Sequence, residues 1–261
     1  MALSTSKTDN VASVLKVVAV IETLSQMRQA PLALIAQRAM TSKSTTHRLL
    51  QTLVDLDYVA QDPETEQYSL TLKLFSVGAQ ALKTEHDLLR LADRGMGRLS
   101  QATGESINLG VMDERKNCVV YVHARASTFG LSMQSTIGQR NPLHSTSLGK
   151  ALLAWRDLDE IEERLAQIDM VAQAPKTITD RDALRAEMER TRARGYAEEI
   201  EESEAGVRCM AVPVRDHLGK TVAAISMSFP LFRFDESKRD TYANLLCEVG
   251  EDLSRKLGFE P

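Results

Sequence analysis

Six polar side chains on a predicted helix carry the chemical groups with which proteins bind nucleic acid. At 3.6 residues per turn, residues 42–56 place their leucines on one side of this helix. Six polar residues lie on the other side of the helix, at its flank and at its start. They carry an ammonium, two hydroxyls, an imidazole, a guanidinium and an amide, in the order Lys43, Ser44, Thr45, His47, Arg48 and Gln51. Such groups reach phosphates and base edges in a DNA major groove. An ordinary amphipathic helix fits the same pattern, so the choice between it and a DNA-binding helix depends on the flanking segments.

Those flanking segments predict a helix-turn-helix followed by a wing. Residues 31–38 form a short apolar helix with Pro31 at or near its first position, and residues 39–41 are a tight connection. Residues 58–61 and 67–70 read as two short strands around a turn-rich segment. Short helix, turn, polar-faced helix and hairpin, in that order, are typical of a winged helix-turn-helix domain that binds double-stranded operator DNA.

Composition indicates a soluble globular protein with room for two domains. The chain has 261 residues, of which 43% are hydrophobic and 26% charged. It shows no signal-peptide pattern and no apolar run long enough to cross a membrane, so we expect a cytoplasmic protein without a membrane partner. The three cysteines are widely spaced and the five histidines lack metal-ligand spacing, so we expect no disulfide framework, metal or cofactor.

The charge balance of the N-terminal part predicts a homo-oligomer. Residues 1–83 contain eight Lys and Arg against seven Asp and Glu. This is weakly basic for a DNA-binding domain, so affinity depends on two or more copies acting together, in a homodimer or homotetramer. The apolar side of the helix over residues 11–27 is wide enough for either a core or a dimer contact.

The chain is expected to fold as two domains, residues 1–83 with a linker helix over 71–83, and residues 84–261. The second part has strands at residues 106–112, 117–124, 196–202, 207–214 and 221–229, with a further strand at 131–136. Helices over 87–101, 158–168, 180–194 and 235–257 are inserted and appended, and Thr179 is placed to cap the helix over 180–194. Grouped strands with separate helices predict an α+β domain with a mostly antiparallel sheet.

The second domain has features of ligand capture and lacks catalytic motifs. The sequence has no phosphate-binding glycine loop and no nucleophile elbow, and the neighbours His144 and Ser145 are poorly placed to act on one substrate. A helix start at residues 146–150 offers the backbone N–H groups of Ser147 and Leu148 to an anion. Two hydroxyls, of Ser226 and Ser228, lie on one face of an apolar strand. They bind a polar ligand, bond to neighbouring backbone, or face water.

Three segments resemble the IclR family of bacterial transcription regulators: residues 42–50, 138–150 and 201–213. Within that family, residues 13–17, 68–75 and 150–156 are most similar to regulators of pectin and hexuronate breakdown that sense 2-keto-3-deoxygluconate. The resemblance implies a GAF-like α/β effector-binding domain and a repressor released by a small carboxylate effector of this kind.

The resemblance also assigns a set of pocket positions: Met133, Ser147, Leu148, Glu199, Val207, Cys209, Ser226 and Ser228. Ser147 replaces a glycine found in many relatives, and Glu199 replaces a shorter aspartate, so the exact effector stays open. Glyoxylate, pyruvate or an aromatic acid is the alternative, and the regulator is a repressor or an activator. An enzyme with an appended helix-turn-helix is the alternative from another class.

Overall fold

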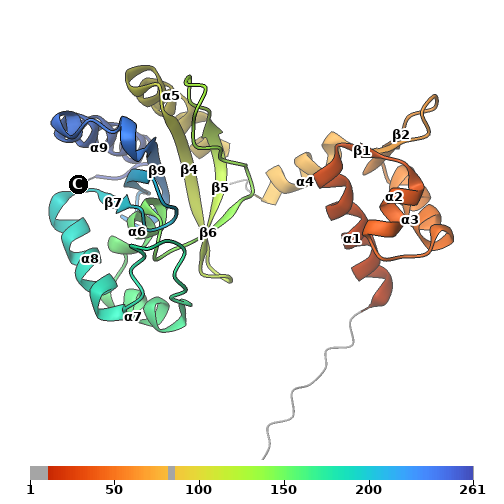
Figure 1. Cartoon of the computed structure of the whole chain (residues 1–261), viewed down its shortest axis with the longest axis horizontal. Helices are drawn as coiled ribbons and strands as arrows, with labels where there is room; N and C mark the ends of the chain where they lie inside the picture. Colours follow the sequence, from red (N-terminus) through yellow and green to blue (C-terminus); the bar gives the residue numbers. More distant parts are fainter. Residues whose placement is uncertain (1–10, 82–85, 261) are drawn as a thin grey trace, which may run out of the picture. The chain divides into compact units, whose positions relative to one another are not determined.

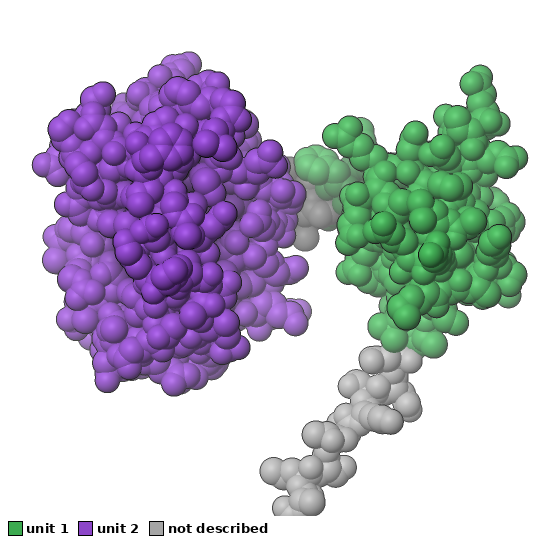
Figure 2. Space-filling model, viewed as in Figure 1, with its two compact units in different colours: residues 1–83 green, residues 84–261 purple. Residues whose placement is uncertain are grey.

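The computed structural model describes residues 11–81 and 86–260, and the chain divides into two compact units, residues 1–83 and 84–261 (Figures 1 and 2). The expected boundary between residues 83 and 84 falls in residues 82–85, which lie outside the described part. One hydrophobic core fills the first unit and two fill the second.

Unit 1 has the order expected of a winged helix-turn-helix domain. Its elements are α1 (Ala12–Met27), β1 (Gln29–Ala30), α2 (Leu32–Arg38), α3 (Lys43–Asp55), β2 (Val59–Gln61), β3 (Tyr68–Leu70) and α4 (Leu72–Ala81). The hairpin of β2 and β3 gains a third strand, because β1 pairs antiparallel with β3. This two-residue strand was not predicted. The core between the helices contains Leu24 of α1, Ile35 of α2 and Leu50 of α3.

Unit 2 is built on one six-stranded sheet with the strand order β6-β5-β4-β9-β8-β7. Its helices are α5 (His86–Thr103), α6 (Ser147–Ala154), α7 (Leu158–Gln167), α8 (Arg181–Arg194) and α9 (Arg239–Lys256), with short 3-10 turns η1 (Leu231–Arg233) and η2 (Glu236–Lys238). Its strands are β4 (Ser106–Asp113), β5 (Cys118–Arg125), β6 (Arg140–Pro142), β7 (Ala197–Ile200), β8 (Val207–Arg215) and β9 (Thr221–Pro230). All neighbouring strands run antiparallel, which confirms the predicted α+β class.

The sheet separates two layers of helices (Figure 1). α5 and α9 pack on one face, and α6 with α7 and α8 packs on the other. Successive side chains of the central strand β9 point to different helix layers. Ile225 and Met227 face the α5–α9 layer, and Ala224 faces α6. Because side chains alternate along a strand, Ser226 and Ser228 lie on the α6 face.

Two local predictions were wrong. Residues 131–136 form no strand, and the edge strand is β6 instead. Side chains from outside residues 131–136 donate to backbone carbonyl groups of this segment. Ser106 Oγ donates to Met133 O at 2.7 Å, and Arg233 Nη2 donates to Leu131 O at 3.0 Å. The cap of α8 is Asp180, not Thr179, because the Asp180 carboxylate accepts from the Ala183 N–H at 2.8 Å.

Candidate DNA-binding and effector-binding sites

Hydroxyl hydrogen bonds fix the start of α3. Ser42 is the N-cap, and its Oγ accepts from the Thr45 N–H at 3.2 Å. Thr46 is fully buried: its Oγ1 lies 2.5 Å from Thr41 Oγ1 in the turn after α2 and donates to the Ser42 carbonyl at 3.0 Å. Leu50 is buried one turn later on the same side. These contacts hold the opposite face of α3 toward solvent.

The six residues predicted to contact DNA lie on that outward side and at the helix start. All are exposed except Thr45, which is half-buried: Lys43, Ser44, Thr45, His47, Arg48 and Gln51. A groove of about 550 Å³ runs beside four of them and is completed by Ser13 and Lys16 of α1, with no carboxylate in its lining. Lys16 thus adds a cation beside Arg48. Only the placement of α1 beside α3 brings Lys16 into this groove, so periodicity within either helix does not predict it.

The tip of the wing is acidic. It carries Asp62, Glu64 and Glu66. Asp62 Oδ1 accepts from the backbone N–H groups of Glu64 at 2.9 Å and Thr65 at 2.8 Å. These bonds stabilise the carboxylate and hold the pKa of Asp62 below its ordinary value. The cationic groups of the predicted DNA surface therefore come from the helices and not from this turn.

In unit 2, strand register brings distant effector candidates onto the α6 face of the sheet. Cys209 of β8 pairs with Glu199 of β7 on one side and with Ser228 of β9 on the other. Ser226 pairs with Asn108 of β4. Directly paired residues face the same side of a sheet. By alternation along β8, Val207 joins Cys209 on this face.

The remaining three candidates border the same face from outside the sheet. Ser147 and Leu148 open α6, and a Leu148 methyl group lies 3.2 Å from the position of a Cβ built on Gly110 of β4. Met133 lines a cavity of about 590 Å³ together with Ser106 and Ala124. The structure thus gathers all eight candidates around one side of the sheet, and it adds Asn108 and Ser106, which sequence reasoning missed.

The polar groups on this face are buried and only partly satisfied. Ser228 Oγ accepts from Asn108 Nδ2 and from Cys209 Sγ, both at 3.3 Å. Glu199 Oε1 accepts from the N–H groups of Glu202 at 3.0 Å and Ser203 at 2.9 Å, and from the Ser203 hydroxyl at 2.9 Å. Glu199 Oε2 and Asn108 Oδ1 have no partner among the described residues. Burial raises the pKa of Glu199, which favours its protonated form.

The start of α6 leaves two backbone donors for a ligand. Thr146 is the N-cap, and its Oγ1 takes the Gly149 N–H at 3.1 Å. The Lys150 N–H closes the first turn on the Thr146 carbonyl at 3.0 Å. Within the described residues, the N–H groups of Ser147 and Leu148 have no acceptor. A Cβ on Gly149 would lie 2.2 Å from the Leu143 carbonyl oxygen, so this turn requires glycine.

A buried ion pair fastens α6 to β7 and the turn that follows. Lys150 is 0% exposed, and its Nζ donates to Glu202 Oε1 at 2.6 Å and to the Glu198 carbonyl at 2.9 Å. Burial raises the pKa of Glu202, while Lys150 opposes the shift. A lysine on a helix is usually solvated, so this pair could not be predicted from the sequence.

Both units match one known family of proteins. Residues 13–63 match the IclR helix-turn-helix domain, and residues 80–255 match the bacterial transcriptional regulator IclR C-terminal domain. The chain belongs to the IclR family.

Curated relatives extend the match over nearly the whole chain. The HTH-type transcriptional regulator KdgR of Escherichia coli (strain K12) is 45% identical over 251 residues, covering 96% of this chain and 94% of that protein. KdgR of Dickeya chrysanthemi is also 45% identical, over 96% of this chain and 81% of its own length. This IclR-family chain is therefore a DNA-binding transcriptional regulator. The alternative of an enzyme with an appended helix-turn-helix was wrong.

Solved structures show the same fold. The crystal structure of Thermotoga maritima IclR matches with a TM-score of 0.84 at 28% identity, covering 96% of this chain and 100% of that one. The C-terminal domain of E. coli KdgR matches with a TM-score of 0.60 at 41% identity, covering 66% and 99%. An IclR homologue from Microbacterium hydrocarbonoxydans, complexed with 4-hydroxybenzoate, matches with a TM-score of 0.79 at 25% identity, covering 94% and 99%.

Other polar clusters of this IclR-family chain have simpler explanations. His144 Nε2 bonds to the Val171 carbonyl at 3.0 Å, and Ser145 Oγ has no partner among the described residues, so the two form no nucleophile–base pair. Within residues 11–81 and 86–260, no group of His, Cys, Asp and Glu is arranged to hold a metal. No helix in those ranges has the length and apolarity to cross a membrane.

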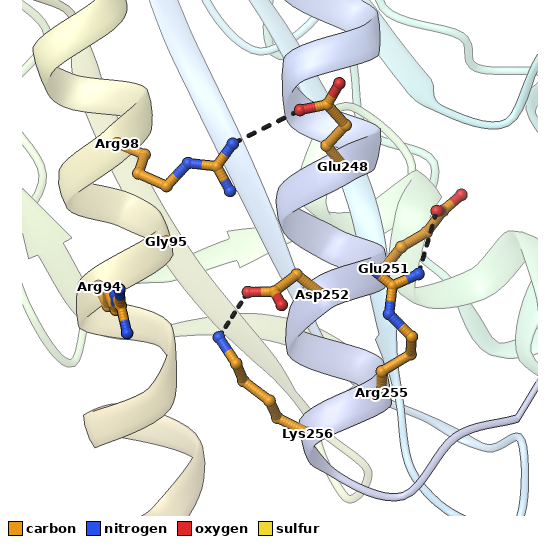
Figure 3. Close-up of a pocket in the computed structure, with 8 residues that line it drawn as sticks. All are labelled: Arg94, Gly95, Arg98, Glu248, Glu251, Asp252, Arg255 and Lys256. Atoms are coloured by element: carbon orange, nitrogen blue, oxygen red, sulfur yellow. Dashed lines mark hydrogen bonds and ion pairs between the residues drawn. The ribbon is translucent and has the colours of Figure 1, made fainter.

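The groove between α5 and α9 is charged, and most of its charges are paired (Figure 3). Arg98 of α5 pairs with Glu248 of α9 at 3.5 Å. Lys256 pairs with Asp252 along α9 at 2.5 Å. A Cβ on Gly95 would lie 2.7 Å from a Val249 methyl group, which shows how closely the helices approach. The groove lies in the layer opposite α6 and holds none of the effector candidates.

Proposed function

We propose that this regulator is a cytoplasmic repressor of sugar-acid catabolic genes, released from operator DNA by 2-keto-3-deoxygluconate or a similar small 2-keto acid. The family resemblance supplies the effector class. The observation that carries it to this chain is the arrangement on the α6 face. Backbone N–H donors of Ser147 and Leu148 border one end, and buried hydroxyl, amide and carboxyl groups lie along β9, β4 and β7.

The chemistry of each end suits a different part of such an acid. A carboxylate gains from unpaired donors and from the dipole at the start of α6. Along the sheet, Glu199 Oε2 and Asn108 Oδ1 lack partners among the described residues, and a buried unpaired polar atom is unfavourable until something binds it. Hydroxyl groups on the effector supply such partners. An aromatic acid is the alternative effector, because one homologue was crystallised with 4-hydroxybenzoate.

Calorimetric titration of the full chain tests the effector. We expect 2-keto-3-deoxygluconate to bind more tightly than pyruvate, glyoxylate or 4-hydroxybenzoate, and to release the protein from operator DNA in a gel shift. The double variant Ser226→Ala/Ser228→Ala should weaken the sugar acid more than pyruvate, because each missing hydroxyl contact costs about 1–3 kcal/mol. Tighter binding of 4-hydroxybenzoate than of the sugar acid would select the aromatic alternative.

A second copy of the chain is the partner we propose for the exposed apolar side of α1. Val14, Leu15 and Val18 are 56%, 56% and 45% exposed. Such a patch is unfavourable on a monomer. Unit 1 is nearly neutral and needs two half-sites for firm binding, so pairing two copies here meets both requirements. Val14→Lys/Val18→Lys should shift the sedimentation profile toward monomer and weaken operator binding. An unchanged dimer or tetramer would place the interface elsewhere.

A further inference from the structure

Asn108 is a buried amide with one half of its hydrogen-bonding capacity unused. It lies in β4, 1% exposed, between Ser226 of β9 and Ala124 of β5. In the orientation the structure gives this amide, Nδ2 donates to Ser228 Oγ at 3.3 Å. That orientation leaves Oδ1 as a buried acceptor with no partner in the described part of the chain.

The hydroxyl beside it is complementary. Ser228 Oγ accepts from Asn108 Nδ2 and from Cys209 Sγ, both at 3.3 Å. A hydroxyl oxygen has two lone pairs and one proton. Both lone pairs are therefore occupied, and the Ser228 proton is left for another acceptor. The corner formed by β4, β8 and β9 thus presents one donor, Ser228 O–H, and one acceptor, Asn108 Oδ1.

A donor and an acceptor side by side match a hydroxyl group, which accepts one hydrogen bond and donates another. A carboxylate can only accept, so it would leave Asn108 Oδ1 facing a negative oxygen. A methylene group would leave both protein groups unpaired. We infer that Asn108, acting with Ser228, reads a hydroxyl group of the effector and so separates hydroxylated 2-keto acids from unsubstituted ones. This inference rests on the proposed function.

The distances along the sheet agree with this assignment. The cavity beside Met133 is lined by Ser106 and Ala124. Asn108 lies two residues after Ser106 on β4 and pairs with Ala124 of β5. Leu148, at the start of α6, packs over Gly110, two residues beyond Asn108. Two residues of strand span about 7 Å, which is comparable to the length of a short sugar acid whose carboxylate lies at α6.

Ser106 provides a matched control on the same strand and face. Its hydroxyl is already engaged, because Oγ donates to the Met133 carbonyl at 2.7 Å. Removing it loosens the segment around Met133 but removes no group that is free to read a hydroxyl. Ser106→Ala should therefore weaken all acids to a similar extent, whereas a change at Asn108 should be selective.

The test is calorimetric titration of the full chain with 2-keto-3-deoxygluconate and with 2-ketohexanoate, which has the same carbon chain without hydroxyls. In Asn108→Leu, affinity for the sugar acid should fall roughly ten- to a hundredfold, while 2-ketohexanoate binds as well as to the wild type or better. If Asn108→Leu does not fold by circular dichroism, Ser228→Ala serves instead and should show the same selectivity.

The outcomes separate the inference from the proposed function. If the wild type binds the sugar acid and Asn108→Leu keeps that affinity, or loses affinity for both acids equally, Asn108 does not read a hydroxyl and the inference alone fails. If the wild type binds neither the sugar acid nor 2-ketohexanoate, the proposed function fails and the inference fails with it. If it binds 2-ketohexanoate alone, only the inference fails.

Discussion

The two units use polar side chains in opposite ways. On α3, the side chains of Arg48 and His47 are exposed to solvent. In unit 2, Asn108 and Ser228 are buried and bonded to each other, and buried Lys150 is bonded to the Glu198 carbonyl of β7 and to Glu202. An exposed group is solvated when nothing is bound, so it can be removed without harm to the fold. A buried polar group belongs to the fold, and its removal leaves partners unpaired.

The strongest test of this contrast is Lys150→Ala. Without its ammonium group, Glu202 remains buried beside the core with an uncompensated carboxylate, and breaking such a pair costs about 3–5 kcal/mol. Urea unfolding at neutral pH should show this loss. Lys176→Ala is the control, since Lys176 Nζ also lies 2.6 Å from its partner, Glu201, but its side chain is 59% exposed. Equal losses in the two variants would contradict the distinction between buried and exposed groups.

Arg48→Ala should have the converse effect. We expect specific operator binding to weaken by about 1–3 kcal/mol if the guanidinium contacts a guanine, with the free energy of unfolding near that of the wild type. Gel-shift titrations against the operator and a scrambled duplex measure the first quantity, and urea unfolding the second. Equal weakening on both duplexes would indicate a phosphate contact, and unchanged affinity would remove Arg48 from the interface.

Two serines in the first turn of α3 are expected to have different roles, one in stability and one in DNA binding. Ser42 caps α3, so Ser42→Ala should lower the free energy of unfolding by about 1 kcal/mol. Ser44 is exposed, and its hydroxyl contacts Ser42 Oγ at 3.2 Å. Ser44→Ala should leave stability nearly unchanged and weaken DNA binding. Chemical unfolding and gel shifts on both variants check this, and a larger loss of stability in Ser44→Ala would reverse the assignment.

The smallest expected effect is the pH dependence contributed by Glu199. Burial raises its pKa, so its contribution to stability is complete below the ordinary glutamate pKa and is lost as pH rises through the higher folded value. Glu199→Gln should therefore flatten the decline of Tm as pH rises above the ordinary glutamate range. Glu201→Gln is the control with the opposite sign, because Lys176 lowers the pKa of Glu201 and its contribution is lost as pH falls. A Tm series across pH 4–8 that shows no difference from the wild type would refute the Glu199 assignment.

The same contrast explains what the sequence could predict. The exposed face of α3 follows from helical periodicity within one segment, and the antiparallel class follows from short alternating strands. The place of Asn108 in the candidate site could not be predicted, because its partner Ser228 is 120 residues later in the chain. Only the register of β4 with β9 brings the two together. Composition predicts a strand at 131–136, because it cannot show that the side chains of Ser106 and Arg233 donate to carbonyl groups of this segment.

The central position of β9 has a mechanical consequence. Alternate residues of this strand belong to different layers: Ser226 and Ser228 lie on the α6 face, while Met227 and Phe229 pack with α5 and α9. Phe229 also stacks edge-on against Phe234, with ring centroids 5.1 Å apart. β9 is hydrogen-bonded on both edges and packed on both faces. A ligand that shifted these serines would therefore also shift Met227 and Phe229, and with them the contacts to α5 and α9.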